Sequence, residues 1–267
     1  GRAPVSAWDT NSLRAAVNER RAAITWQAEG RESSVALERL DGYSLLVNGK
    51  SDGSAISDAP TQVMLGLIPA ILHRRPETAL VIGLGTGQTA GWLAQVPSIQ
   101  KVDVLELEPV VAIAAEQFAA VNNDVLASPK VHLIFGDARE LVLTLRERYD
   151  LVVSEPSNPY RAGVASLFTT EFYEAVSARL KPSGLFAQWV QAYELSPRAV
   201  ASVLGTLAGP FRFVETWETL VIGDLVLLAS NIELQHDVSV IRGRTETEPY
   251  RSALAYVWGV SGVEGLY

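Results

Sequence analysis

From residue 78 onward, apolar segments of strand length alternate with segments of helical pattern. The strand-like segments are ALVIG, KVDVLEL, VHLIF, YDLVVS and GLFAQWV, and helical patterns occur between them, for example at about 138–147 and 168–180. Strands that are apolar along nearly their whole length are buried on both faces, so the alternation predicts a mostly parallel sheet covered by helices. Two later segments, FRFVETW and DLVLLAS, have a short connection and predict an antiparallel end of that sheet.

The region before residue 76 has a different pattern. Three short segments with strand character lie within residues 25–55, and Asp41-Gly42 between the last two is typical of a two-residue hairpin turn. This pattern predicts a small antiparallel β unit, from which an apolar helix at 61–72 leads out. We therefore expect a lead-in, β unit and connecting helix at 1–75, an α/β domain at 76–232, and an unassigned C-terminal extension at 233–267.

Composition excludes several classes of function. The net charge is −8, and no basic stripe is present that would neutralise nucleic-acid phosphates. The chain has no cysteine, and its histidines lack metal-ligand spacing, so no metal site is predicted. No run reaches the roughly 18 apolar residues of a membrane helix. We expect a soluble, cytoplasmic domain that binds a small molecule, and its first residue, glycine, suggests a chain processed or cut from something longer.

The strand ALVIG runs directly into the loop Gly83-Leu84-Gly85-Thr86-Gly87. Glycine permits positive φ and close approach of a ligand to the backbone, and the following helix directs its N–H groups at that ligand. A tight strand-to-helix turn without any ligand would give the same pattern. The spacing G-x-G-x-G is one residue shorter than the dinucleotide fingerprint, so it favours S-adenosylmethionine or a related sulfonium nucleoside over NAD.

Acidic side chains end three consecutive strands of the predicted sheet. Glu106 lies about twenty residues after the glycine loop, where an acid binds ribose hydroxyls in doubly wound folds. Asp137 ends the next strand, and Glu155 follows the one after it. Each acid taken singly is equally consistent with a solvated loop residue. Because these strand ends share one edge of the sheet, we expect the three carboxylates to line one pocket for a cationic nucleoside.

The segment VSEPSNPY, residues 153–160, places Glu155 between a buried strand and two prolines. Pro156 and Pro159 restrict the backbone and reduce the entropy lost in holding the carboxylate over a cleft. An amine that attacks carbon beside a sulfonium must lose a proton, which a carboxylate within hydrogen-bond reach can accept. Glu155 is therefore predicted to be a general base. The alternative is a structural acid that accepts hydrogen bonds from nearby backbone N–H groups.

Over about residues 40–195 the sequence resembles the spermidine synthase (polyamine aminopropyltransferase) family, and it is most similar to bacterial branches fused to membrane segments. The motifs are GLGTG, VLELEP, GDAR, YDLVVSEPSNP and SLFTTEFYEAVSARLKPSGLFAQW. The resemblance implies a methyltransferase-like (Rossmann-like) α/β domain after a small β domain, and a transferase of polyamine biosynthesis. Such enzymes transfer an aminopropyl group from decarboxylated S-adenosylmethionine to an amine and release 5′-methylthioadenosine. Family members are commonly dimers or tetramers, so a homodimer is also implied.

The resemblance also implies a nucleoside site. Its members on this chain would be Gly83, Gly85, Gly87, Glu106, Asp137 and Ala138. By position, the glycines would enclose the nucleoside, Glu106 would bind the ribose hydroxyls, and Asp137 with Ala138 would bind the adenine amino group.

At the reactive end of the donor the chain departs from the family pattern. Gln62 matches a family glutamine near the sulfonium, and Asp58 is the counterpart of an acid that binds the aminopropyl ammonium. The family motif D-S-S-D-P is replaced by residues 155–159, so Glu155 stands for the first aspartate and Asn158 for the second, while Thr61 replaces a tyrosine. An unpaired ammonium in a partly dry pocket would cost on the order of 1–3 kcal/mol, which weakens the case for a dicationic acceptor such as putrescine.

The sequence is also consistent with three other functions. Glu155 could promote elimination or intramolecular attack on S-adenosylmethionine itself, as in a lyase or cyclase that needs no acceptor. The chain could be a nucleoside-sensing domain of a membrane protein, or an ordinary methyltransferase. Trp189 and Tyr193 follow or end the fifth strand and could shape an acceptor pocket, and Arg161 would pair with a carboxylate if the donor is intact S-adenosylmethionine.

Overall fold

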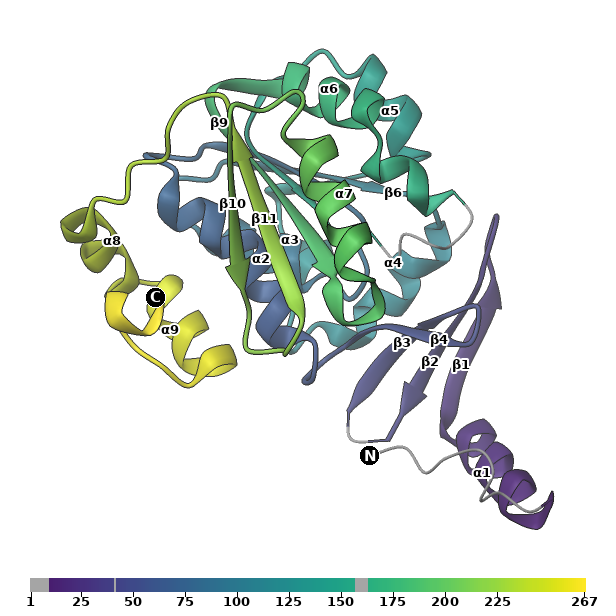
Figure 1. Cartoon of the computed structure of the whole chain (residues 1–267). Helices are drawn as coiled ribbons and strands as arrows, with labels where there is room; N and C mark the ends of the chain where they lie inside the picture. Colours follow the sequence, from purple (N-terminus) through teal and green to yellow (C-terminus); the bar gives the residue numbers. More distant parts are fainter. Residues whose placement is uncertain (1–9, 41, 157–162) are drawn as a thin grey trace.

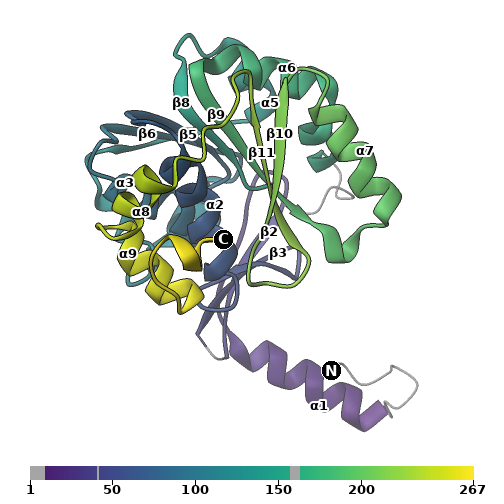
Figure 2. The same cartoon turned by 60° about the vertical axis from the view of Figure 1, so that its left-hand side comes forward.

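The computed structural model describes residues 10–40, 42–156 and 163–267. It contains two sheets, a four-stranded sheet near the N-terminus and a seven-stranded sheet flanked by helices (Figure 1). The first helix, α1 (Thr10–Ala23), extends from the small sheet away from the rest of the molecule (Figures 1 and 2). None of the helices in these ranges is both long and apolar enough to cross a membrane.

The N-terminal sheet is antiparallel throughout, as the sequence predicts. Its strands in spatial order are β1 (Ile24–Glu29), β2 (Ser34–Arg39), β3 (Tyr43–Val47) and β4 (Lys50–Ser54). The predicted hairpin at Asp41-Gly42 joins β2 to β3; Asp41 itself lies outside the described residues. The helix that follows, α2 (Ala59–Leu72), confirms the helix predicted at 61–72 and begins two residues earlier because Pro60 suits its first turn.

The large sheet has the strand order β10-β11-β9-β8-β5-β6-β7. Its parallel strands are β5 (Thr78–Ile82), β6 (Lys101–Glu106), β7 (Val131–Phe135), β8 (Tyr149–Ser154) and β9 (Leu180–Gln191). The last two strands, β10 (Phe213–Glu218) and β11 (Asp224–Ser230), are antiparallel and extend the β9 edge. Both the mostly parallel sheet and its antiparallel end are therefore confirmed.

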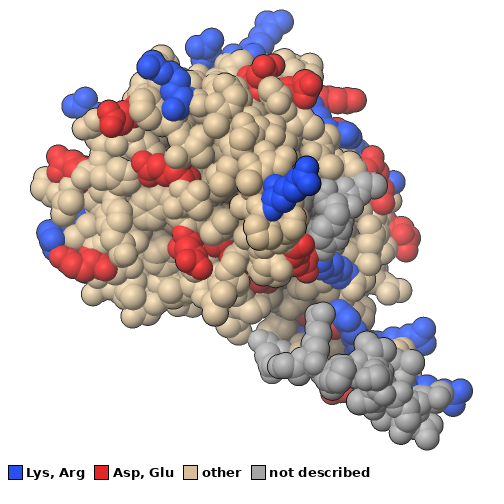
Figure 3. All heavy atoms as spheres, in the orientation of Figure 1, with Lys and Arg blue, Asp and Glu red and all other residues tan. Residues whose placement is uncertain are grey.

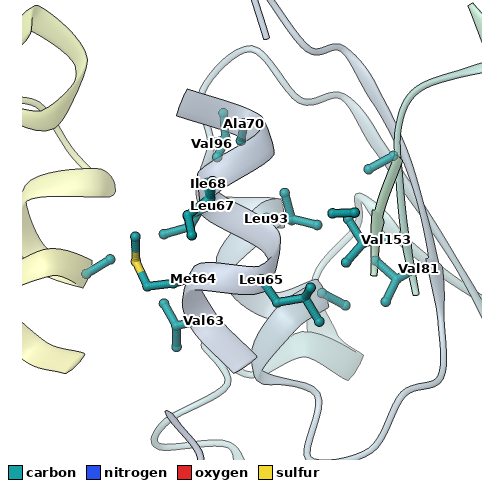
Figure 4. Packing of buried hydrophobic residues seen from close by; sticks show 14 of the residues in the cluster. Val63, Met64, Leu65, Leu67, Ile68, Ala70, Val81, Leu93, Val96 and Val153 are labelled. Carbon is teal, nitrogen blue, oxygen red and sulfur yellow. The ribbon is translucent and has the colours of Figure 1, made fainter. Parts of the chain in front are cut away.

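Helices cover both faces of this sheet. One face packs against α2, α3 (Gln88–Gln95) and α4 (Pro109–Ala115), and the other against α5 (Ala138–Thr144), α6 (Thr170–Arg179) and α7 (Pro197–Leu207). Alternate residues of the central strands serve the two sides, so Val81 and Val153 point toward α2 whereas Leu80 and Val152 belong to the opposite layer. Figure 4 shows Leu65 of α2 directed at Val81 and Val153.

The C-terminal extension, which the sequence left unassigned, packs against α2 (Figure 2). It contains α8 (Val238–Thr245), α9 (Tyr250–Ala253), a π-helical turn at Leu254–Trp258 and a 3₁₀ turn at Val263–Gly265. The Arg244 guanidinium donates to backbone carbonyls at the C-terminal end of α2, including that of His73 at 2.5 Å. At the other end of α2, the Trp258 indole donates to the Pro60 carbonyl at 3.1 Å. The extension thus fixes the helix that carries Gln62.

This packing predicts the effect of a cavity in the extension. Leu254→Ala is expected to lower the free energy of unfolding by about 2–5 kcal/mol, because Leu254 is fully buried in the core shared with α2. The matched control is Val240→Ala on α8, whose side chain is 46% exposed and whose truncation should cost less than about 1 kcal/mol. Urea unfolding measures both values. Equal, small losses would show that the extension adds little to the core.

Candidate active site

A cavity of about 510 Å³ lies between the carboxyl edge of the large sheet and the N-terminal sheet. One wall comes from the loops that follow β5, β6, β7 and β8, and the other from β3, β4 and the turn between β1 and β2. The carboxyl edge is where open α/β sheets bind ligands, and the volume falls in the range of roughly 300–1,000 Å³ that small-molecule sites occupy.

The glycine loop leaves β5 at the floor of this cavity. Gly83, Gly85 and Gly87 all have positive φ, at 93°, 52° and 81°. A Cβ on Gly83 would lie 3.0 Å from the Glu155 carbonyl oxygen, whereas a Cβ on Gly85 would meet no atom within 4 Å. The absence of a side chain at Gly83 therefore allows the loops that follow β5 and β8 to approach each other closely. At Gly85 it leaves the backbone accessible from the cavity. Gly87 instead caps the start of α3 and supports the turn.

Glu106 holds the glycine loop in place from the end of β6. One of its carboxylate oxygens accepts from the Leu84 N–H at 2.8 Å, and the other accepts from the Glu108 N–H at 2.9 Å. Asn122 adds a second support by donating to the Thr86 carbonyl at 2.9 Å. Burial raises the pKa of Glu106, and the side chain still forms part of the cavity wall. Each oxygen keeps a further lone pair that a ligand hydroxyl can use.

Asp137 and Ala138 form the cavity wall after β7, at the start of α5. The Asp137 carboxylate accepts from the Arg139 backbone N–H at 2.9 Å and from the Arg139 guanidinium. These hydrogen bonds lower the pKa of Asp137, so it is ionised at neutral pH. The pairing with Arg139 was not predicted from the sequence, and it uses part of the acceptor capacity that the adenine amino group would need.

Glu155 lines the same cavity from the end of β8, and its side chain contacts Thr89 and Gln62. The Thr89 hydroxyl lies 2.7 Å from a carboxylate oxygen of Glu155 and 2.8 Å from the backbone carbonyl of Gln62. A hydroxyl has one proton, so it can donate fully to only one of these two acceptors. When Glu155 is protonated, it donates to Thr89, and Thr89 donates to Gln62. Thr89 can therefore pair with Glu155 in either protonation state, and its donation to the carboxylate lowers the pKa of Glu155.

The protonation of Glu155 is balanced near neutral pH. Burial raises its pKa to about 7, and the nearby charges of Asp52 and Asp58 act in the same direction. Hydrogen bonds from Thr89 and Gln62 to the carboxylate oppose this shift. A carboxyl group with this pKa can both take up and release a proton at physiological pH, which is what a general base requires.

The other residues predicted for the reactive end of the donor site lie at different positions relative to the cavity. The Gln62 amide is buried beneath the loop, where its oxygen accepts from Thr86 at 2.7 Å and from Gln88 at 2.9 Å. Asp58 precedes α2 and does not line the cavity, although burial raises its pKa and its charge acts on Glu155. Asn158 and Arg161 lie outside the described residues.

The aromatic candidates Trp189 and Tyr193 occupy different environments. Trp189 in β9 lines the cavity. Tyr193, which is 54% exposed, is not part of the wall. The histidines are dispersed: His73 follows α2, His132 lies in β7, and His236 contacts Glu215 at the edge strand β10. In the described part of the chain, no group of three or more potential metal ligands comes together.

Two polar residues of this region were missed by sequence reasoning. Thr89 lies in the first turn after the glycine loop, and this place in the sequence was the only signal for it; its contact with Glu155 is seen only in the structure. Asp224 begins β11 and is 2% exposed, with one oxygen accepting from the Thr61 hydroxyl at 2.6 Å. Burial raises the pKa of Asp224. After Gly223 it looks like an ordinary turn residue in the sequence.

The distribution of charge agrees with a small-molecule site. On the face shown in Figure 3, basic and acidic side chains are interspersed and form no continuous basic stripe. Within the cavity wall the described basic residues already have acidic partners: Lys50 bonds Glu194 at 2.8 Å, and Arg139 bonds Asp137. Asp52 and Asp58 add negative charge near Glu155.

Comparison with known proteins gives a consistent result. The family described as spermine/spermidine synthase domain matches residues 59–222. Polyamine aminopropyltransferase 2 of Hyperthermus butylicus is 29% identical over 182 residues, covering 67% of this chain and 60% of that protein. Putrescine N-methyltransferase 2 of Nicotiana tabacum is 27% identical over 229 residues, covering 81% of this chain and 62% of that protein. The chain thus spans less than two thirds of these relatives.

Solved structures agree on the fold. A crystal structure of spermidine synthase in complex with the transition-state analogue AdoDATO superposes with a TM-score of 0.78. The match covers 88% of this chain and 85% of that chain at 16% sequence identity. The spermidine synthase of Thermotoga maritima gives a TM-score of 0.74, also at 16% identity. At this level of identity the likeness establishes the architecture, a small β-sheet domain followed by a methyltransferase-like α/β domain.

Proposed function

Because this chain belongs to the spermine/spermidine synthase domain family, we propose that it transfers an aminopropyl group from decarboxylated S-adenosylmethionine to an amine. The products are 5′-methylthioadenosine and the extended amine. The main support for this proposal is the position of Glu155: its carboxyl group, with a pKa of about 7, lies in the same cavity that Glu106 and the glycine loop line.

In this proposal the adenosine part of the donor lies over the glycine loop. The open backbone at Gly85 leaves room for the nucleoside, and Glu106 binds the ribose hydroxyls with its remaining lone pairs. Asp137 and Ala138, which line the same cavity, bind the adenine amino group. No metal is needed for this arrangement, because the sulfonium donor is already activated.

The charges near Glu155 support a decarboxylated donor. Asp52 and Asp58 both raise the pKa of Glu155 through their negative charge, so the reactive end of the cavity is acidic. An additional carboxylate on the donor would be repelled there, since like charges near a shared site raise each other's energy. An ammonium or sulfonium would instead be attracted and would lower the pKa of Glu155.

The transfer step follows from the position of the base. The amine nitrogen loses its proton to Glu155 and forms a bond to the donor carbon beside sulfur. The carbon–sulfur bond breaks, and its electron pair converts the sulfonium into the neutral thioether of 5′-methylthioadenosine. The Thr89 hydroxyl, which donates to the carboxylate before the transfer, can then accept from protonated Glu155 while it donates to the Gln62 carbonyl. Orientation of the two reactants supplies most of the remaining rate.

The pKa of Glu155 gives a prediction for the pH profile. The base is the ionised form, whose fraction rises with pH, so kcat/KM for the donor is expected to increase through an apparent pKa near 7. Thr89→Val removes a hydrogen bond that lowers this pKa and should move the midpoint upward, whereas Thr89→Ser should leave it in place. Initial rates between about pH 5 and 9 provide the measurement. Identical midpoints in all three proteins would contradict the assignment.

The reaction itself is tested by product analysis. The protein is incubated with decarboxylated or intact S-adenosylmethionine, with and without putrescine, and the products are followed by mass spectrometry. Methylthioadenosine that appears only with decarboxylated donor and amine together supports the proposal. Release from either donor without amine would instead indicate a lyase or cyclase. Tight binding without turnover would indicate a sensing domain.

A second candidate is methyl transfer to an amine. The relative from Nicotiana tabacum is named putrescine N-methyltransferase 2 and matches 81% of this chain. The same base and nucleoside wall would serve that chemistry, with intact S-adenosylmethionine as the donor. S-adenosylhomocysteine in the experiment above would identify it.

A further inference from the structure

Glu108 occupies an unusual position at the end of β6. It directly precedes α4 as the N-cap residue, yet its side chain makes no capping hydrogen bond. Its two carboxylate oxygens accept instead from the backbone N–H groups of Arg31 and Glu32, at 2.5 and 2.6 Å. These donors belong to the turn between β1 and β2, so the residue joins the α/β domain to the N-terminal sheet.

The surroundings of Glu108 fit this contact closely. The residue is 5% exposed, and a Cβ on Gly30 would lie 2.2 Å from its carboxylate oxygen. Only glycine at residue 30 therefore lets the turn approach the carboxylate. Two successive N–H groups facing two acceptor oxygens form a complementary pair, and an amide in place of the carboxylate would present N–H to one of the donors.

This contact lies beside the proposed ribose site. The Glu108 backbone N–H donates to Glu106 at 2.9 Å, and Glu108 itself lines the cavity. The turn that it holds contributes Glu32 and Ser33 to the opposite wall. Glu108 therefore links Glu106, the proposed ribose-binding residue two positions earlier, to the turn of the N-terminal sheet that forms the opposite wall of the cavity.

We propose that Glu108 is a positioning residue, which fixes the β1–β2 turn over the nucleoside end of the cavity and so completes the donor site. The inference rests on the proposed function for the identity of the ligand. The fold does not depend on this contact alone, because Val35, Leu37 and Leu45 anchor the same sheet in the apolar core. Loss of the carboxylate should release the turn without unfolding the sheet.

Glu108→Gln tests this role with two independent measurements. NMR hydrogen exchange should show the Arg31 and Glu32 amides exchanging at least about tenfold faster, because each loses or weakens a charged acceptor. Calorimetry should show 5′-methylthioadenosine binding about tenfold more weakly. With saturating donor, kcat should stay within about twofold, since the residue does not touch the reacting atoms. Glu116→Gln, an exposed residue just after α4, is the matched control and should behave like the parent.

Gly30→Ala provides a second variant, because it displaces the turn from the other side of the same contact. It should reproduce the weaker binding and, if Glu108→Gln fails to fold, it replaces that variant in both measurements. Unchanged exchange at Arg31 and Glu32, or faster exchange with unchanged nucleoside affinity, would overturn the positioning role. Failure of the parent and of Glu116→Gln to bind methylthioadenosine would instead overturn the proposed function.

Discussion

Glu155→Gln is expected to lower kcat by about 10²–10⁴-fold, because the glutamine amide is too weakly basic to take the proton of the attacking amine. Affinity for 5′-methylthioadenosine should change by less than about threefold. Glutamine keeps the size of the side chain, and the proposed adenosine contacts come from other residues of the cavity wall. The effect is therefore expected in turnover and not in binding.

The variant also separates a base from a structural acid. Single-turnover rates give the chemical step, and calorimetry gives nucleoside affinity, each at about pH 8, where most of the parent Glu155 is ionised. If Glu155 were structural, glutamine could accept from Thr89 equally well and turnover would be retained. The matched control is Glu140→Gln, an exposed residue on α5, which should leave both quantities unchanged.

Burial of Glu155 has a further consequence for stability. Its pKa is about 7 in the folded chain and near the ordinary 4.5 when unfolded, so between these values unfolding releases a proton. The contribution of this group to stability is therefore greatest below about pH 4.5 and is lost as pH rises through 7. Glu155→Gln lacks this titration. The parent should lose stability relative to the variant over this range.

Glu106→Gln is expected to weaken 5′-methylthioadenosine binding by about 100-fold. Hydrogen bonds to a charged group contribute roughly 1.5–3 kcal/mol each, and the carboxylate is proposed to bind ribose hydroxyls while it also fixes the Leu84 N–H of the glycine loop. An amide keeps one acceptor and places a donor against the other N–H. The substitution should therefore weaken the hydrogen bonds to the ribose and also loosen the glycine loop at Leu84.

Calorimetric titration of Glu106→Gln with methylthioadenosine measures this effect, and Glu116→Gln again serves as the charge-matched control. Thermal unfolding of both variants shows whether loop disruption has spread to the fold. An affinity equal to that of the parent would mean that Glu106 only supports the glycine loop and does not bind the ligand.

Much of the fold was predictable because its strongest signals are local. Near-continuous apolar strands required burial on both faces, and the change of pattern before residue 76 marked the small sheet. The C-terminal extension could not be predicted, because its structure depends on contacts with distant residues and not on local signals. Its helices are short, and they are placed by contacts such as Arg244 with the carbonyls at the end of α2, which lie 171 residues away for His73.

In the site too, some features could be predicted from local sequence signals, whereas others depend on contacts between distant segments. Parallel strands place their carboxyl ends at one edge, so the convergence of Glu106, Asp137 and Glu155 on one cavity followed from sequence order. The roles of these residues stay predictions. Partners that arrive from distant segments carried no local signal, as with the Glu108 contact to Arg31, 77 residues apart. Side-chain geometry was also needed to find that Thr89 shares one proton between two acceptors.

A crystal structure of the protein with 5′-methylthioadenosine bound would test the proposed donor site most directly. We expect the ribose hydroxyls within hydrogen-bond distance of the Glu106 carboxylate, the adenine beside Asp137 and Ala138, and the thioether sulfur on the side of Glu155. A nucleoside bound elsewhere, or a purine that does not enter between the glycine loop and the N-terminal sheet, would contradict the proposed donor site.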